Sequence, residues 1–209
     1  MDIYREYGYY KDKQVDFCGS NGSVYINEFG TLDKIIETSN TDLEEKYNKM
    51  LKRQKEIEKT TLLLGKLYIS NNCRGAVLPY FNNHDKFTKL LSSKNYELII
   101  PKLIEVIDCV DELENSFIYP EDVCNSSNIL INRSTGKIEL IDLTDDGTDI
   151  RDMKRDYKYS AVLLSLSMLV ANSLPNISTD RYFNIQTNEE LKEFLEFTQK
   201  DKVYKKVLK

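Results

Sequence analysis

Two polar side chains flank a pair of apolar segments in the middle of the chain. Asn128 opens the segment 128–131, and Asp142 lies near the end of the segment 138–143. Gly136 lies in the polar turn between them and can adopt positive φ, so we predict that the two segments form a β-hairpin. Antiparallel pairing would bring the carboxamide and the carboxylate together, and these are oxygen ligands that suit Mg²⁺. The alternative is an ordinary hairpin with polar ends.

A glycine-containing turn near the N-terminus could contact phosphate groups. Gly19 and Gly22 flank a polar dipeptide, and Val24 follows two residues later. Such a turn between two strands lets backbone N–H groups approach phosphates closely, although any hairpin could carry the same glycine pair. Lys34 follows on the next strand-like segment. It is either a phosphate contact or an exposed strand lysine.

Residues 41–60 are predicted to form a helix. Thr41 and Glu44 fit a capping box, and apolar residues recur at helical spacing. On this spacing Glu58 falls on the buried stripe, where an unpaired carboxylate is costly, and Lys34 is its expected partner. The alternative is that Glu58 is a boundary residue near a frayed helix end.

The order of these features resembles the protein-kinase-like superfamily. Gly19, Gly22 and Val24 match its glycine-rich loop pattern, although Phe17 replaces the first glycine. The resemblance implies that Lys34 holds nucleotide phosphates and pairs with a helix glutamate, here Glu58. Asn128 would end the catalytic loop, and Asp142 would begin the DFG segment, so both would bind the metal.

Two further strands and a helix fit the same order. Strands are predicted over 62–70 and 75–81, and Pro79 cannot continue an interior ladder. By resemblance this is the hinge, where Leu78 and Tyr80 would frame the adenine edge. An amphipathic helix is predicted over 101–113, with its proline in the first turn.

The catalytic loop departs from the family pattern. That pattern places an Asp five residues before the Asn, as acceptor of the substrate hydroxyl proton. Counting back from Asn128 reaches Val123, and Asp122 lies one residue further away. With a one-residue insertion, Asp122 is the catalytic base. Without it, Asp122 is a bystander in a pseudokinase.

The segment after Asp142 is acidic and short. It leads, through residues 145–156, into an apolar helix predicted over 159–174. Little room remains for a peptide-docking activation loop, so the chain resembles the small-molecule branch that contains aminoglycoside and choline kinases. Asp156 either hydrogen-bonds the catalytic-loop backbone, as the resemblance implies, or caps the helix. The acidic residues either bind a cationic acceptor or a second metal, or form a solvated loop.

The resemblance implies an α+β, two-lobed protein-kinase-like fold. Residues 1–80 would form an N-lobe with a small antiparallel sheet and one helix, and residues 81–209 a reduced, mainly helical C-lobe. ATP and Mg²⁺ are the expected cofactors, and the acceptor is a hydroxyl of an unknown small molecule or protein. The alternative is a catalytically inactive pseudokinase that binds nucleotide or a protein partner.

Composition argues against several other classes. The chain has 29 Lys and Arg against 34 Asp and Glu, a net charge of −5, which argues against nucleic-acid and polybasic membrane partners. The run 159–174 is too short and too polar to span a bilayer. The polar segment 1–13 does not resemble a secretory signal, and the four scattered cysteines fit a reducing compartment. We therefore expect a cytoplasmic protein without a zinc site.

Overall fold

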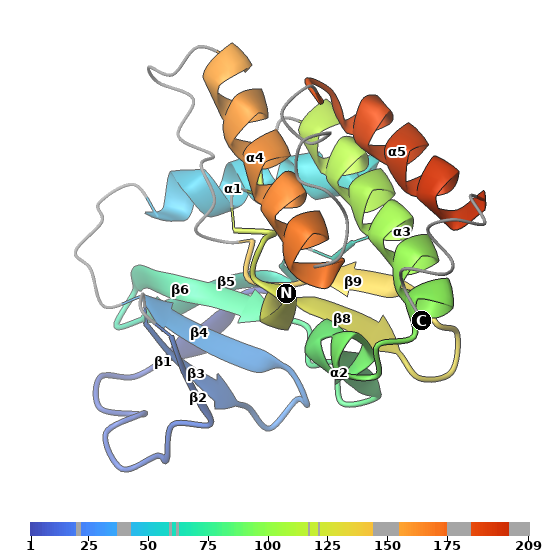
Figure 1. Cartoon of the computed structure of the whole chain (residues 1–209). Helices are drawn as coiled ribbons and strands as arrows, with labels where there is room; N and C mark the ends of the chain where they lie inside the picture. Colours follow the sequence, from blue (N-terminus) through green and yellow to red (C-terminus); the bar gives the residue numbers. More distant parts are fainter. Residues whose placement is uncertain are drawn as a thin grey trace. The chain divides into compact units, whose positions relative to one another are not determined.

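The computed structural model describes residues 1–19, 22–36, 43–58, 60–61, 63–116, 118–120, 122–143, 155–174 and 185–200, with the side chains of 18–19 and 155–160 left aside. The architecture is α+β. The chain divides into two compact units, Met1–Asn82 and Asn83–Lys209, whose elements are labelled in Figure 1.

Unit 1 is built on a six-stranded sheet in the order β1-β5-β6-β4-β3-β2. The strands are β1 Ile3–Arg5, β2 Phe17–Gly19, β3 Gly22–Ile26, β4 Leu32–Ile36, β5 Gly65–Ile69 and β6 Asn72–Leu78. β1 pairs with β5 in parallel, whereas the other four pairings are antiparallel. The prediction of an antiparallel sheet was therefore wrong at one edge. The polar N-terminal segment supplies a three-residue strand that is too short to leave a periodic signal.

One helix of unit 1, α1 Leu43–Arg53, buries Leu43, Tyr47 and Met50. A 3₁₀ turn, Gln54–Glu56, follows it, and Ile57 is extended. The prediction of a continuous helix to residue 60 was wrong, and so was the placement of Glu58 on a buried stripe. Glu58 is exposed, because helical spacing no longer applies once the backbone leaves the helix. Thr41 of the expected capping box lies outside the described residues.

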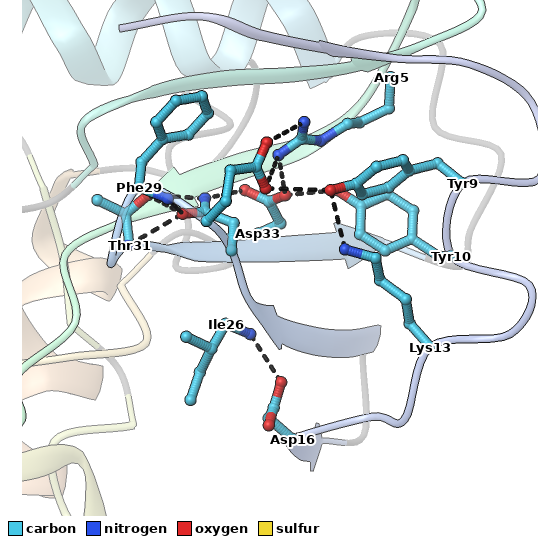
Figure 2. A network of polar contacts seen from close by, with 11 residues as sticks. Arg5, Tyr9, Tyr10, Lys13, Asp16, Ile26, Phe29, Thr31 and Asp33 are labelled. Carbon is cyan, nitrogen blue, oxygen red and sulfur yellow. Dashed lines mark hydrogen bonds and ion pairs between the residues drawn. The ribbon is translucent and has the colours of Figure 1, made fainter.

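A polar network lies on the face of this sheet opposite to α1, and Figure 2 shows it from close by. Its centre is the fully buried carboxylate of Asp33. The Tyr10 hydroxyl donates to Asp33 Oδ2 at 2.5 Å, Asn27 Nδ2 donates to Oδ1 at 2.6 Å, and Arg5 Nη2 donates to Oδ2 at 3.4 Å. Arg5 also forms a bidentate ion pair with Glu28. These contacts fix the N-terminal segment to the strand that carries Asp33.

The described residues of unit 2 form a three-stranded antiparallel sheet and four helices. The sheet order is β7-β8-β9, with β7 His84–Lys86, β8 Ile129–Asn132 and β9 Ile138–Leu140. The helices are α2 Phe87–Ser92, α3 Tyr96–Asn115, α4 Arg155–Ser173 and α5 Asn188–Lys200. Figure 1 shows α4, α3 and α5 side by side, with β9 against α3.

Two helices of unit 2 differ from their predictions. α3 begins at Tyr96, and Pro101 lies inside it, so the expectation of a start at Pro101 was wrong. A proline in the second turn removes only one intrahelical hydrogen bond. α4 buries Leu166 and Val170 but exposes Leu164 and Met168, so its apolar sequence does not make it buried on all sides. No helix within the described residues is long and apolar enough to cross a membrane.

Candidate functional site

The hairpin predicted from the sequence is present in unit 2. β8 and β9 pair antiparallel, with Ile129 opposite Leu140 and Ile131 opposite Ile138. Gly136 in the connecting turn has φ of +73°, in the region that favours glycine. Buried Ile129 and Leu140 anchor the open end of the hairpin. This end carries the polar residues that prompted the prediction.

Asn128 and Asp142 both lie at this open end. The backbone N–H of Ile141 donates to the Asn128 carbonyl at 2.9 Å, which extends the strand pairing by one step. Asp142 therefore follows directly on the residue paired with Asn128. Its φ of +65° is left-handed, which is uncommon outside glycine and tolerated best by Asn and Asp. Such backbone outliers concentrate at functional sites.

Asp122 is brought to the same place by the fold of its loop. Successive turns link Val123 to Pro120, Asn125 to Asp122, and Asn128 to Asn125 through backbone hydrogen bonds of 3.3, 3.1 and 2.9 Å. The result is a side-chain contact, because Asn128 Nδ2 donates to Asp122 Oδ2 at 3.1 Å. The extra residue in this loop therefore does not carry Asp122 away from Asn128.

The loop is also tied to α4. The backbone N–H of Cys124 donates to the Ser165 hydroxyl at 2.8 Å, and Ser165 is buried. Asn125 caps the following 3₁₀ turn, Ser126–Asn128, by accepting from the Ser127 N–H. These anchors hold the loop that presents Asp122.

A small pocket lies between this loop and the hairpin. Its lining is Pro120, Asp122, Val123, Asn128, Ile129, Leu140, Ile141 and Leu143. The pocket combines apolar walls with one carboxylate and one carboxamide. The described residues contain no group of three or more His, Cys, Asp and Glu side chains that could hold a metal by themselves. Mg²⁺ commonly takes one or two carboxylates and completes its shell with phosphates and water, so these residues fit Mg²⁺ only together with a phosphate ligand.

The expected phosphate-binding residues lie in unit 1. Lys34 is in the middle of β4, aligned with Val24 on β3 and Ala76 on β6. It is only 5% exposed, so the alternative of an exposed strand lysine was wrong. Lys66 is aligned with the same Ala76 and forms an ion pair at 3.6 Å with Glu44 of α1. Because aligned residues share a sheet face, Lys34 belongs to the face that α1 covers.

Gly22 of the glycine pair has a steric reason that does not involve phosphate. Gly19 and Gly22 are paired at the end of the β2–β3 hairpin, and the two residues between them lie outside the described residues. A Cβ on Gly22 would lie 1.9 Å from the carbonyl oxygen of Ile35. Glycine is therefore required there by the close approach of β3 to β4.

The remaining residues predicted for the site are Leu78 and Tyr80 of the expected hinge, Glu58, and the acidic segment after Asp142. β6 ends at Leu78, which pairs with Leu32, and Pro79 follows directly, as its missing N–H predicts. Tyr80 is 38% exposed just beyond the strand. Glu58 is exposed beyond the 3₁₀ turn. The acidic residues 145–152, and the side chain of Asp156, lie outside the described residues.

The sequence did not predict a polar cluster that joins α3 to α5. Asp111 and Glu114 lie in the last turns of α3, and both accept a hydrogen bond from Asn188 at the start of α5. The predicted helix ended at residue 113, so Glu114 was not assigned to it. A spacing of more than seventy residues separates the partners, and no local pattern connects them.

No protein-family model matches the sequence, and a search of curated proteins finds no match.

Proposed function

We propose that the chain is an ATP- and Mg²⁺-dependent phosphotransferase that acts on a hydroxyl of a small molecule or protein. The observation that carries the proposal is the contact between Asp122 and Asn128, next to Asp142 in a left-handed conformation. Asp122, as acceptor of a hydroxyl proton, would then lie beside two metal ligands, Asn128 and Asp142. This is the chemistry that phosphoryl transfer requires of a kinase-like site.

The order of elements along the chain supports the same proposal. A glycine turn between two strands precedes the strand of Lys34, then α1, β5 and β6, and, after β7 and α2, then α3, the loop and the hairpin. This is the order of the kinase-like resemblance. A buried lysine on the helix-covered face of the sheet is consistent with the role of a phosphate contact. These points support a two-lobed kinase-like fold, which remains part of the proposal.

Each residue has a distinct proposed task. Asn128 and Asp142 would hold Mg²⁺, which neutralises charge on the phosphates when it is bound. Asp122 would orient the acceptor hydroxyl and take its proton. Lys34 of unit 1 would contact the nucleotide phosphates. Catalysis would therefore consist of positioning and charge stabilisation.

Asp122→Asn tests the assignment most directly, because it keeps the shape of the side chain and removes the proton acceptor. Nucleotide binding should persist, and turnover should fall about 10²–10⁴-fold, the usual contribution of a general base. Asp12→Asn is the matched control, because Asp12 is an exposed residue of unit 1. ATP consumption is measured first as hydrolysis and then with a panel of hydroxyl acceptors.

The outcomes separate the two readings of the chain. A wild-type protein that binds ATP and Mg²⁺ but consumes no ATP with any acceptor would favour the pseudokinase alternative. Full activity in Asp122→Asn would refute the role of this carboxylate. Absence of nucleotide binding with and without Mg²⁺ would refute both readings.

A further inference from the structure

A second cavity of unit 2 lies where the end of α3 meets α4 and the start of α5. It has a volume of about 440 Å³, within the range of small-molecule sites. Its lining is Asp111, Glu114, Asn115, Leu163, Gln186, Thr187 and Asn188. No lining residue is shared with the pocket beside Asn128. The two pockets are therefore lined by different residues, and ligand binding at one does not require the phosphotransferase function proposed for the other.

Glu114, which lines the cavity, has a buried carboxylate with one oxygen that accepts no hydrogen bond. Asn188 Nδ2 donates to Asp111 Oδ1 and to Glu114 Oε2, both at 2.7 Å, which uses both hydrogens of the amide. Glu114 is only 4% exposed, and its Oε1 is buried without a hydrogen-bond partner. A buried acceptor without a donor is costly, and each such group in a folded protein needs an explanation. A ligand that donates to Oε1 provides one.

The charges around the cavity are predominantly negative. Asp111 and Glu114 from α3 line the cavity, and Asp108 from α3 and Glu189 and Lys192 from α5 interact electrostatically with Asp111. Lys192 contacts Asp108 at 2.9 Å and Asp111 at 4.0 Å. The described side chains of α4, residues 161–173, carry no charge. Burial and, to a smaller extent, Asp111 raise the pKa of Glu114 to about 7.

We propose that this cavity binds a small organic cation, a protonated primary amine with a short alkyl body, whose N–H groups donate to Glu114 Oε1 and Asp111. Three features select this class. The unfilled group is an acceptor, the local charge is negative, and Leu163 supplies an apolar wall. An anion would meet two carboxylates. The described residues include no group of three or more His, Cys, Asp and Glu side chains that could hold a metal ion here.

The test uses the full chain and n-butylammonium chloride as the probe. n-Butanol has the same alkyl body without the charge, and tetramethylammonium chloride has the charge without N–H donors. Side-chain amide resonances are followed by NMR, with that of Asn188 assigned by substitution. Saturable shifts of the Asn188 resonance with butylammonium alone are expected. Equal shifts with all three compounds, or none with butylammonium, would overturn the proposal.

The pH dependence provides a second readout. Butylammonium requires ionised Glu114, whose pKa is about 7 in the free protein, so its affinity should rise about tenfold between pH 6 and pH 8. Glu114→Gln should weaken binding at least about tenfold at pH 8 and remove this dependence, because one charged acceptor is lost. The matched control is Glu193→Gln, which changes an exposed residue of α5 and should bind as the wild type does.

A third variant covers the case in which Glu114→Gln does not fold. Asp111→Asn keeps the shape of the second carboxylate and should also weaken butylammonium binding. Binding that is unchanged in a folded Glu114→Gln variant, or in Asp111→Asn where the first variant fails to fold, would overturn the proposal.

Discussion

Replacing Glu114 by Gln should make the protein more stable at neutral and alkaline pH and leave it unchanged in mild acid. Burial raises the pKa of this carboxyl from its ordinary value of 4.5 to about 7, because the ionised form loses its hydration in the folded protein. Glutamine has nearly the same shape and no charge. Its amide oxygen can still accept from Asn188 Nδ2, now bonded to Glu114 Oε2.

The magnitude follows from the difference between the two pKa values. The interval from 4.5 to about 7 corresponds to about 3 kcal/mol, at 1.36 kcal/mol for each pKa unit. For an acid whose pKa is raised in the folded state, the unfolded chain releases its proton first. The contribution of Glu114 to wild-type stability therefore falls as pH rises from 4.5 to about 7 and is constant above. Glu114→Gln lacks this loss, so its advantage should reach about 3 kcal/mol near pH 8 and vanish near pH 4.5.

Urea unfolding followed by circular dichroism at 222 nm measures this advantage, since most of the described helical residues belong to unit 2. The wild type, Glu114→Gln and the exposed-site control Glu193→Gln are compared at several pH values between 4.5 and 8. The stability of the control should follow that of the wild type. An advantage of Glu114→Gln that does not grow with pH, or that the control shares, would refute the reasoning about a buried ionised carboxylate.

Three other outcomes are expected. Tyr10→Phe should cost about 1.5–3 kcal/mol in urea unfolding, because its hydroxyl donates to the buried carboxylate of Asp33, whereas Tyr7→Phe at a 91% exposed site should change stability by less than about 0.5 kcal/mol. Lys34→Met should remove most of the ATP-induced rise in melting temperature, and an undiminished rise would contradict the phosphate contact. Asp142→Ala should abolish only the Mg²⁺-dependent part of that rise, and a part that persists would contradict its role as a metal ligand.

The sequence predicted best where a local pattern determines the structure. The hairpin that ends in Asn128 and Asp142 was predicted from two apolar segments and the glycine turn between them, and strand pairing confirms it. The strand position of Lys34 follows equally from local signals, whereas the strand predicted over 75–81 ends at Leu78, because Pro79 cannot continue the ladder. In each case, the preferences of neighbouring residues agree with the tertiary structure.

Predictions failed where the answer depends on partners distant in sequence or on where an element stops. Glu58 was placed by extending helical spacing past Arg53, where the backbone changes to a 3₁₀ turn. The contact between Asp122 and Asn128 was left open between two alternatives, because it depends on three successive backbone turns that a count of residues does not reveal. The edge strand Ile3–Arg5 is stabilised by its pairing with β5 and not by its own composition.

Asp33 and Glu114 show how two buried carboxylates of one chain can have different meanings. Both are nearly inaccessible, and an acidic residue is rarely buried without partners. Asp33 has donors on both oxygens, from Asn27 on Oδ1 and from Tyr10 and Arg5 on Oδ2. Its bonding capacity is used within the fold, so its charge serves to hold the N-terminal segment. Glu114 has a donor on one oxygen only, its other oxygen is buried without a donor, and the residue lines the cavity at the end of α3. The second carboxylate is therefore the one whose bonding an external cation would complete.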